Sequence, residues 1–246
     1  VEIIAYEHGY HGLLTGKYLQ IDDDARAHAS RLQLYGGSPI GNSRVKLTNT
    51  ADLVKRGLIK EGEDALKVAA DQLVKDGVDV LHTIGGDDTN TTAADLAAYL
   101  EAHKYHLTVV GLPKTIDNDI WGTDDSFGFA TALEIATEAI DRLHSTAHSH
   151  HRIILVEIMG HKAGWLALGA GIAGGADVIL IPEIPYTIES ITKTIEHRKK
   201  AGKHFSVVAV AEGAMDTEYA ARLRVADQLI KDADSPETKE MARNSK

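Results

Sequence analysis

Two short acidic stretches carry the residue types that could do chemistry in this chain. Residues 113–119 read Pro-Lys-Thr-Ile-Asp-Asn-Asp, which places a lysine and two carboxylates directly after an apolar run. Residues 85–89, Gly-Gly-Asp-Asp-Thr, follow another apolar run earlier in the chain. Carboxylates can hold Mg²⁺ or accept a proton, and glycines let backbone N–H groups approach a phosphate. Together the two stretches are typical of a phosphoryl-transfer site.

The elements that must position these stretches alternate between apolar runs and helical patterns. Strands are predicted for the apolar runs 78–84, 107–112, 153–159, 178–181 and 205–211. Helices are predicted for 63–75, 89–103, 126–147, 162–173 and 187–201, with Thr89 as the N-cap of the second. Near-continuous apolar strands that alternate with helices predict mostly parallel sheets buried on both faces. Because ligands bind beyond the carboxyl ends of such strands, both acidic stretches are expected at a binding site.

Composition excludes several classes of function. The 246 residues suffice for one large α/β domain or for two small ones; we expect two, at 1–125 and 126–246, with a polar tail from about residue 232. The net charge of −10 disfavours binding to nucleic acid or to an anionic membrane. Cysteine is absent, which excludes disulfides and a cysteine nucleophile and fits a reducing compartment. No apolar run approaches the ~20 residues of a membrane span. We therefore expect a cytoplasmic protein.

Two further patterns have both a functional and a structural interpretation. Residues 169–174, Gly-Ala-Gly-Ile-Ala-Gly, match the glycine pattern of dinucleotide folds, but they close a helix and precede a strand. The dinucleotide pattern does the reverse, so helix packing is the favoured interpretation. His144, His148, His150 and His151 could form a metal site. A polar helix end is favoured, because no carboxylate accompanies them at ligand spacing.

In their order along the chain, the motifs resemble the 6-phosphofructokinase family. Besides the two acidic stretches, the resemblance rests on residues 122–129, 157–160, 163–165 and 175–183. It covers roughly residues 1–215 and implies two Rossmann-like three-layer α/β/α domains with mostly parallel sheets and the active site in the cleft between them. A Gly-Gly-Asp loop alone also resembles NAD kinases and lipid kinases. The sugar-side motifs at 157–160 and 211–213 disfavour an NAD kinase.

Within the resemblance, Asp88 and Lys114 bear on the phosphoryl donor. Members of the family that use ATP typically have glycine at the position of Asp88 and often glycine at that of Lys114. The pair resembles the pyrophosphate-dependent branch. A carboxylate at position 88 would crowd and repel the α-phosphate of a nucleotide, whereas pyrophosphate ends before that point. Lys114 would supply a charge to the smaller donor. Some ATP users carry lysine at the second position, so ATP stays the alternative donor.

The resemblance also assigns residues to catalysis, metal binding and donor binding. Asp117 matches the aspartate that takes the proton of the sugar 1-hydroxyl, and Thr115 matches a residue that hydrogen-bonds the substrate. Asp87 resembles the Mg²⁺ ligand, with Asp119 assisting the metal or positioning the site. Arg44 ends a glycine-rich stretch, 36–44, that is similar to the one whose arginine reaches the donor phosphate. Gly86 is expected to let the loop backbone approach the donor.

On the acceptor side, Met159 and Gly160 match positions that line the fructose 6-phosphate pocket, and Glu212 matches a sugar-binding carboxylate. Arg152 corresponds to an arginine that reaches the 6-phosphate bound by a neighbouring subunit, so the resemblance implies a homo-oligomer that is at least a dimer. His161 departs from the pattern, which commonly has arginine there. That departure puts phosphate stabilisation at this point in doubt.

The implied activity is reversible transfer of a phosphoryl group from pyrophosphate, or alternatively ATP, to fructose 6-phosphate with Mg²⁺ as cofactor. The family's glycine-rich phosphate turn, expected before Val1, and its basic segment after Glu212 have no match in the chain. The resemblance therefore implies the middle part of a longer enzyme. A non-catalytic subunit or fragment is the alternative from another functional class, although retention of both acidic stretches argues against it.

Overall fold

The computed structural model describes residues 1–34 and 36–232, and its contacts divide the chain into two compact units. The first unit is Val1–Lys114 and the second begins at Thr115. The sequence analysis had placed this boundary at 125/126. The polar tail was expected from about residue 232, and its residues beyond Asp232 lie outside the described part of the chain. None of the helices within the described ranges is long and apolar enough to cross a membrane.

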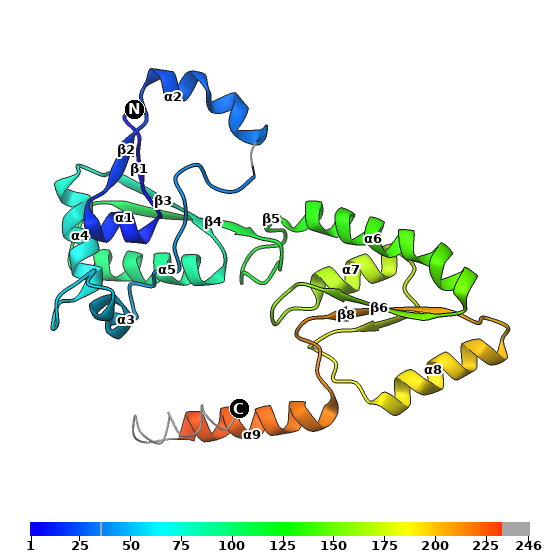
Figure 1. Cartoon of the computed structure of the whole chain (residues 1–246). Helices are drawn as coiled ribbons and strands as arrows, with labels where there is room; N and C mark the ends of the chain where they lie inside the picture. The colour runs from blue at the N-terminus through cyan, green and yellow to red at the C-terminus, as the bar shows by residue number, and fades with distance from the viewer. Residues whose placement is uncertain (35, 233–246) are drawn as a thin grey trace. The chain divides into compact units, whose positions relative to one another are not determined.

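The first unit (Figure 1) packs helices against a parallel strand pair. Strand β3 (Val80–Gly85) pairs in parallel with β4 (Thr108–Thr115), and Ile84 lies opposite Leu112. Its other elements are β1 (Ile4–Tyr6), α1 (Tyr10–Thr15), β2 (Tyr18–Gln20), α2 (Asp23–Ala27), the 3-10 helix η1 (Ala29–Leu34), α3 (Thr50–Lys55), α4 (Ala65–Lys75) and α5 (Asp87–Ala102). A core formed by side chains of α1, α3, α4, β3 and α5, including Leu13, Leu53, Leu73, Leu81 and Leu96, holds this unit together.

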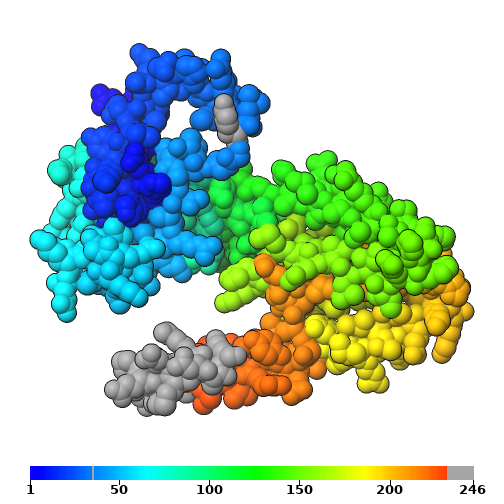
Figure 2. All heavy atoms as spheres, viewed as in Figure 1, coloured from blue at the N-terminus to red at the C-terminus, as the bar shows by residue number. Residues whose placement is uncertain are grey.

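One segment of the first unit lies away from that core. Helix α2 and the 3-10 helix η1 contain no buried residue, and they arch away from the remainder of the unit in Figure 2. Strands β1 and β2 form a short antiparallel pair before them. Sequence analysis missed both features, because three-residue strands and polar five-residue helices leave too short a hydrophobic period to detect.

The second unit has its own parallel sheet, in the order β6-β8-β7. Helices α6 and α7 lie on one face of this sheet and α8 on the other (Figure 1). Its elements are β5 (Phe127–Gly128), α6 (Phe129–His150), β6 (Ile153–Ile158), α7 (Trp165–Ala173), β7 (Val178–Leu180), α8 (Ile188–Lys200), β8 (Ser206–Ala211) and α9 (Thr217–Asp232). The expected α/β class with parallel sheets is confirmed, and each predicted strand and helix is present with ends shifted by a few residues.

The expectation that the strands are buried on both faces was wrong for most of them. Only β8, the middle strand of its sheet, is buried nearly throughout. In β3, buried and exposed residues alternate, so that Leu81 and Thr83 face the helices while Val80 and Ile84 are exposed. An apolar residue in a run therefore did not by itself indicate a covered face.

The glycine pattern at residues 169–174 belongs to helix packing, as the sequence favoured. A Cβ atom at Gly169 would lie 2.8 Å from Leu133, and one at Gly171 would lie 2.8 Å from Ile179. At Gly174 the same atom would meet Ile140, also at 2.8 Å. These glycines let α7 approach α6 and β7 closely. The dinucleotide interpretation fails because α7 ends here and β7 follows.

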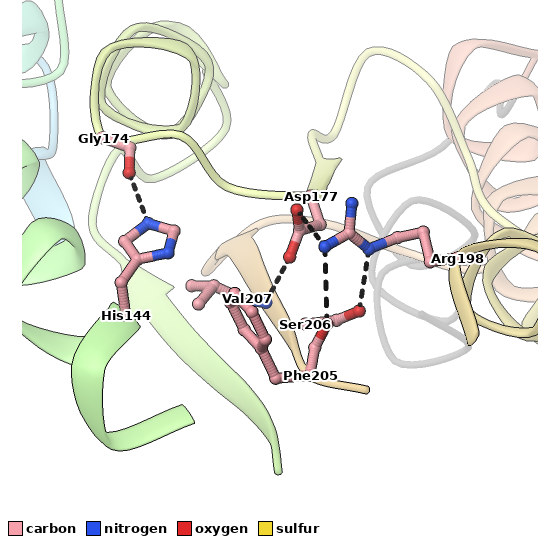
Figure 3. A network of polar contacts seen from close by, with 7 residues as sticks. All are labelled: His144, Gly174, Asp177, Arg198, Phe205, Ser206 and Val207. Carbon is pink, nitrogen blue, oxygen red and sulfur yellow. Dashed lines mark hydrogen bonds and ion pairs between the residues drawn. The ribbon is translucent and has the colours of Figure 1, made fainter. Parts of the chain in front are cut away.

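A network of polar contacts beside β8 joins three elements of the second unit (Figure 3). Arg198 on α8 forms an ion pair of 2.7 Å with Asp177, and its Nε donates to the Ser206 hydroxyl at 3.1 Å. Asp177 Oδ2 accepts the backbone N–H of Val207 at 2.9 Å. The side chains of Arg198 and Asp177 are only 23% and 13% exposed, so each charge depends on its partner.

The histidines near this network lie in structural contacts. His144 Nε2 donates to the carbonyl oxygen of Gly174 at 2.7 Å (Figure 3). The rings of His144 and His148 pack edge-on against Phe205. His151 is the left-handed residue after the last turn of α6. These contacts fit the polar helix end that the sequence favoured.

Replacement of Asp177 by alanine is expected to lower the free energy of unfolding by about 3 kcal/mol, because it leaves a largely buried arginine without its partner. Chemical denaturation of the full-length protein measures the loss. As a matched control, Glu218→Ala removes a carboxylate from the exposed Arg222 pair, whose side chains are 80% and 70% exposed. We expect the control to cost less than about 1 kcal/mol. Equal losses in the two variants would contradict the prediction.

Candidate active site

The loop after β4 is organised by its own side chains. The Thr115 hydroxyl accepts the backbone N–H of Asp117 at 3.1 Å. Asn118 has a φ of 54°, a left-handed conformation that asparagine tolerates well. Its Oδ1 accepts the N–H of buried Ser126 at 2.8 Å, and its Nδ2 donates to the carbonyl oxygen of Asp124 at 3.1 Å. These bonds hold the Asp117 segment in one conformation, and sequence analysis had given Asn118 no role.

Asp117 lies in an acidic environment within the second unit. Burial raises the pKa of its carboxyl group above the ordinary value, and the neighbouring Asp119 and Glu212 charges raise it further. The Thr115 hydroxyl and His161 oppose this rise. The sequence predicted functional roles for Thr115 and Asp117 from one motif and for Glu212 from another, and the fold brings the two motifs together. A carboxylate with a raised pKa is a stronger base, as proton abstraction from a hydroxyl requires.

The raised pKa predicts a stability gain in Asp117→Asn. The folded state favours the protonated acid, so that its stabilising effect is full below the ordinary pKa of an aspartate and is lost as pH rises through the raised pKa. As pH rises through the raised pKa the wild type takes on the ionised, disfavoured form, whereas asparagine stays neutral. Thermal unfolding is therefore expected at a higher temperature in the variant near neutral pH, with the difference shrinking towards about pH 4. Asp125→Asn, an exposed residue of the same loop, is the control. A lower unfolding temperature of Asp117→Asn at both pH values would contradict this.

Asp119 offers an oxygen atom that suits a cation. Its Oδ1 is buried and has no hydrogen-bond partner within the described residues. An unpartnered buried carboxylate oxygen is costly, and a hard cation such as Mg²⁺ would satisfy it. Residues 1–34 and 36–232 contain no group of three or more histidine, aspartate or glutamate side chains placed to hold a metal. A Mg²⁺ that takes one or two carboxylates and completes its shell with phosphate oxygens and water needs no such group.

The predicted acceptor residues meet at the carboxyl ends of β6 and β8. Glu212 follows β8, and its backbone N–H donates to the carbonyl oxygen of Ile158 at the end of β6. Glu212 Oε1 accepts the backbone N–H groups of Gly160 at 3.0 Å and of His161 at 2.6 Å. These bonds lower the pKa of the Glu212 carboxyl group. Met159, directly before this turn, has an exposed side chain.

Arg152 does not join the other acceptor residues of its own chain. It directly precedes β6, whereas Met159 and Gly160 follow the opposite end of that strand. A strand rises about 3.3 Å per residue, so that about 20 Å separates Arg152 from Ile158, the last residue of β6. Arg152 is therefore not placed with Met159 and Gly160 of its own chain, and its contact with a sugar phosphate stays a prediction.

Three of the predicted donor and metal residues, Gly86, Asp87 and Asp88, lie at the start of α5. This helix begins at Asp87 rather than at Thr89, because Gly86 adopts the extended N-cap conformation and both aspartates enter the first turn. Gly86 has a φ of −80°, which any residue can adopt. Asp88 forms an ion pair of 2.6 Å with Lys46. Sequence analysis missed Lys46, although a basic residue two positions after Arg44 was a possible signal for it.

The stretch before Arg44 is anchored to the turn between β1 and α1. The backbone N–H of His8 donates to the carbonyl oxygen of Ile40 at 2.8 Å, and the Ser43 hydroxyl donates to the His8 carbonyl oxygen at 2.7 Å. A Cβ atom at Gly41, whose φ is 73°, would lie 2.2 Å from the His8 ring. The stretch therefore needs this glycine. Arg44 lies between this anchor and Lys46, and its side chain is exposed.

Comparison with known proteins identifies the family. The family model described as Phosphofructokinase matches residues 1–244. The chain belongs to the phosphofructokinase family. An ATP-dependent 6-phosphofructokinase of Propionibacterium freudenreichii subsp. shermanii is 49% identical to it over 244 residues, which cover 99% of this chain and 61% of that protein. This phosphofructokinase-family chain thus spans about three fifths of that relative's length.

Pyrophosphate-dependent relatives match a shorter part of the chain at higher identity. A pyrophosphate–fructose 6-phosphate 1-phosphotransferase of the same Propionibacterium strain is 60% identical over 166 residues, 67% of this chain and 41% of that protein. The corresponding enzyme of Methylotuvimicrobium alcaliphilum is 56% identical over 167 residues, 68% of this chain and 41% of that protein. The relatives therefore include enzymes named for both donors.

Solved structures agree with the fold. A phosphofructokinase of Pichia pastoris in the T-state superposes with a TM-score of 0.73 at 32% identity, over 88% of this chain and 23% of that one. A pyrophosphate-dependent phosphofructokinase of Marinobacter aquaeolei gives the same TM-score at 22% identity, over 98% of this chain and 64% of that one. The second likeness concerns the fold alone.

Proposed function

We propose that the full-length protein transfers a phosphoryl group from pyrophosphate to the 1-hydroxyl of fructose 6-phosphate, reversibly, and forms fructose 1,6-bisphosphate. The observation that carries the choice of donor is Asp88 together with Lys114. Asp88 lies in the first turn of α5, the end of a helix that otherwise favours anions such as phosphate. A carboxylate there competes with a nucleotide's α-phosphate, which pyrophosphate lacks.

The remaining residues divide the chemistry between them. Asp117 takes the proton of the sugar 1-hydroxyl, and Thr115 holds the Asp117 backbone and hydrogen-bonds the substrate. Lys114 and Arg44 bind donor phosphates, where Arg44 can bond two oxygens and Lys114 acts as a point charge. Asp87 and Asp119 would hold the Mg²⁺. When bound, the cation neutralises charge on the transferring phosphoryl group.

The acceptor is held by the second unit. Met159 and Gly160 line the sugar, and Glu212 accepts a sugar hydroxyl through Oε2, because Oε1 is taken by the Gly160 and His161 amides. Arg152 contacts the 6-phosphate bound by a neighbouring copy, so the active form is a homo-oligomer that is at least a dimer. Burial raises the pKa of Asp117, which strengthens the base at the reacting hydroxyl.

ATP is the second candidate donor. The relative that matches 99% of this chain is named as ATP-dependent. In addition, Lys46 neutralises Asp88 at 2.6 Å, which weakens the repulsion that a nucleotide would meet. The ion pair is exposed and is worth less than about 1 kcal/mol, so that it breaks readily and Lys46 neutralises Asp88 only while the pair is formed.

Steady-state assays of the full-length protein with Mg²⁺ and each donor test the proposal. We expect kcat/KM with pyrophosphate to exceed that with ATP by at least about 100-fold, equivalent to about 2.7 kcal/mol. Preference for ATP would overturn the choice of donor. Binding of fructose 6-phosphate in calorimetry without turnover of either donor would instead indicate a non-catalytic subunit.

A further inference from the structure

The loop between β6 and α7, residues 159–164, is held at both ends by carboxylates from neighbouring strands. At its start, Glu212 Oε1 accepts the N–H groups of Gly160 and His161. At its end, Glu183 Oε1 accepts the N–H of Gly164 at 2.8 Å. Glu212 follows β8 and Glu183 follows β7, so both carboxylates lie beyond the carboxyl ends of the parallel strands.

The backbone N–H groups that donate to these carboxylates have few other acceptors within reach. Gly160 and Gly164 are buried, and a buried N–H without a partner destabilises the fold. Gly164 is the N-cap residue of α7 and has no side chain with which to cap the helix. Glu183 provides the missing cap from another element. A carboxylate at a helix N-terminus also interacts favourably with the helix dipole.

The loop is packed so tightly that its conformation depends on glycine. Gly160 has a φ of 150°, and a Cβ atom there would lie 2.5 Å from the Ala163 carbonyl oxygen. A Cβ atom at Gly164 would lie 2.5 Å from Glu183 Oε2, and one at Gly213 would lie 2.2 Å from the His161 carbonyl oxygen. His161 itself has a φ of 52°, a left-handed conformation unusual for a residue with a side chain. A strained loop of this kind persists only when its surroundings hold it.

We propose that Glu183 is a positioning residue for the acceptor sugar. With Glu212 it clamps both ends of the 159–164 loop, and this clamp fixes the backbone of Met159 and Gly160 before the substrate binds. The inference rests on the proposed binding of fructose 6-phosphate at these residues. Preorganisation of this kind improves affinity because the loop does not have to be ordered when the sugar binds.

Substitutions of Glu183 in the full-length protein test the clamp. Glu183→Ala removes the cap, and Glu183→Gln keeps an acceptor oxygen at the same place. Calorimetry is expected to show that the Kd of fructose 6-phosphate rises about tenfold in Glu183→Ala, the effect of losing one hydrogen bond to a charged group. Glu183→Gln is expected to stay within about threefold of the parent, because its amide oxygen accepts the same N–H. Glu196→Ala, an exposed acidic residue of α8, is the matched control.

Hydrogen exchange of the loop provides a second readout that needs no substrate. We expect the amides of residues 160–164 to exchange about tenfold faster in Glu183→Ala, while the β8 amides keep their rates, as local opening requires. Unchanged loop exchange overturns the clamp. Faster exchange with an unchanged Kd overturns its role in sugar binding but keeps the clamp. A parent protein that binds no fructose 6-phosphate overturns both the positioning role and the proposed function, and the exchange rates alone then report on the clamp.

Discussion

Replacement of Asp117 by alanine is expected to reduce kcat by about 10³-fold, the range of a lost general base. Asp117→Asn should be equally impaired, because an amide cannot accept the proton of the sugar hydroxyl. The fold should survive, because the loop is held by the Thr115 hydroxyl and the backbone N–H of residue 117, which both variants keep. Steady-state kinetics of the full-length enzyme, in both directions of the reaction, measure the loss.

The specificity of this effect can be checked with an exposed carboxylate of the same loop. Asp125→Ala is the matched control and should keep nearly normal kcat. Calorimetry should give a Kd of fructose 6-phosphate close to that of the parent in Asp117→Asn, because the proposed sugar-binding residues Gly160 and Glu212 are unchanged. Near-normal turnover in Asp117→Asn would remove the base assignment, while loss of sugar binding would indicate that the residue serves binding rather than proton transfer.

Replacement of Asp88 by glycine is expected to shift the preference between donors. The ratio of kcat/KM with pyrophosphate to that with ATP should fall by about 100-fold, because juxtaposed like charges cost several kcal/mol and each 1.4 kcal/mol is a factor of ten. The double variant with Lys114→Gly should fall further, since pyrophosphate then loses a cation as well. Competition assays with both donors in one mixture measure the ratio directly.

Asparagine at position 88 separates charge from size. Asp88→Asn keeps the shape of the side chain and removes its charge. A change in the ratio close to that of the glycine variant would identify repulsion as the cause, whereas a small change would identify crowding. Circular dichroism checks that α5 remains, because glycine in the first turn of a helix can cost up to about 1 kcal/mol. An unchanged ratio in both variants would refute the role of Asp88 in donor choice.

Local sequence patterns were sufficient for the main elements and insufficient for their ends. The strands around β3, β4, β6, β7 and β8 were predicted because each is a short apolar run between helical patterns. The start of α6 was displaced from Ser126 to Phe129, because Gly128 has a φ of 107° and the Ser126 N–H is already bound by Asn118. Helix ends depend on such single contacts, which no hydrophobic period records.

The candidate active site likewise followed only in part from the sequence. The acidic stretches at 85–89 and 113–119 place Asp87 and Asp117 after strands through chain order alone, so the position of each at a strand end followed from the sequence. The interaction partners of the site residues did not follow from the sequence. Lys46 reaches Asp88 from a loop far along the chain, and Glu183 binds the N-cap residue of α7, which stands nineteen positions before it. Contacts between residues that are this far apart in the sequence are determined by packing rather than by local propensity.

The amino-acid sequence by itself determined the α/β class, the family and the residues that carry charge beside the strand ends, because these depend on composition, hydrophobic period and short motifs. The tertiary structure decided which of those charges are paired and which carboxylates hold the 159–164 loop. The physical reason is that a buried N–H or charge accepts whichever partner the packed chain brings within about 3 Å, and only the folded backbone specifies that partner.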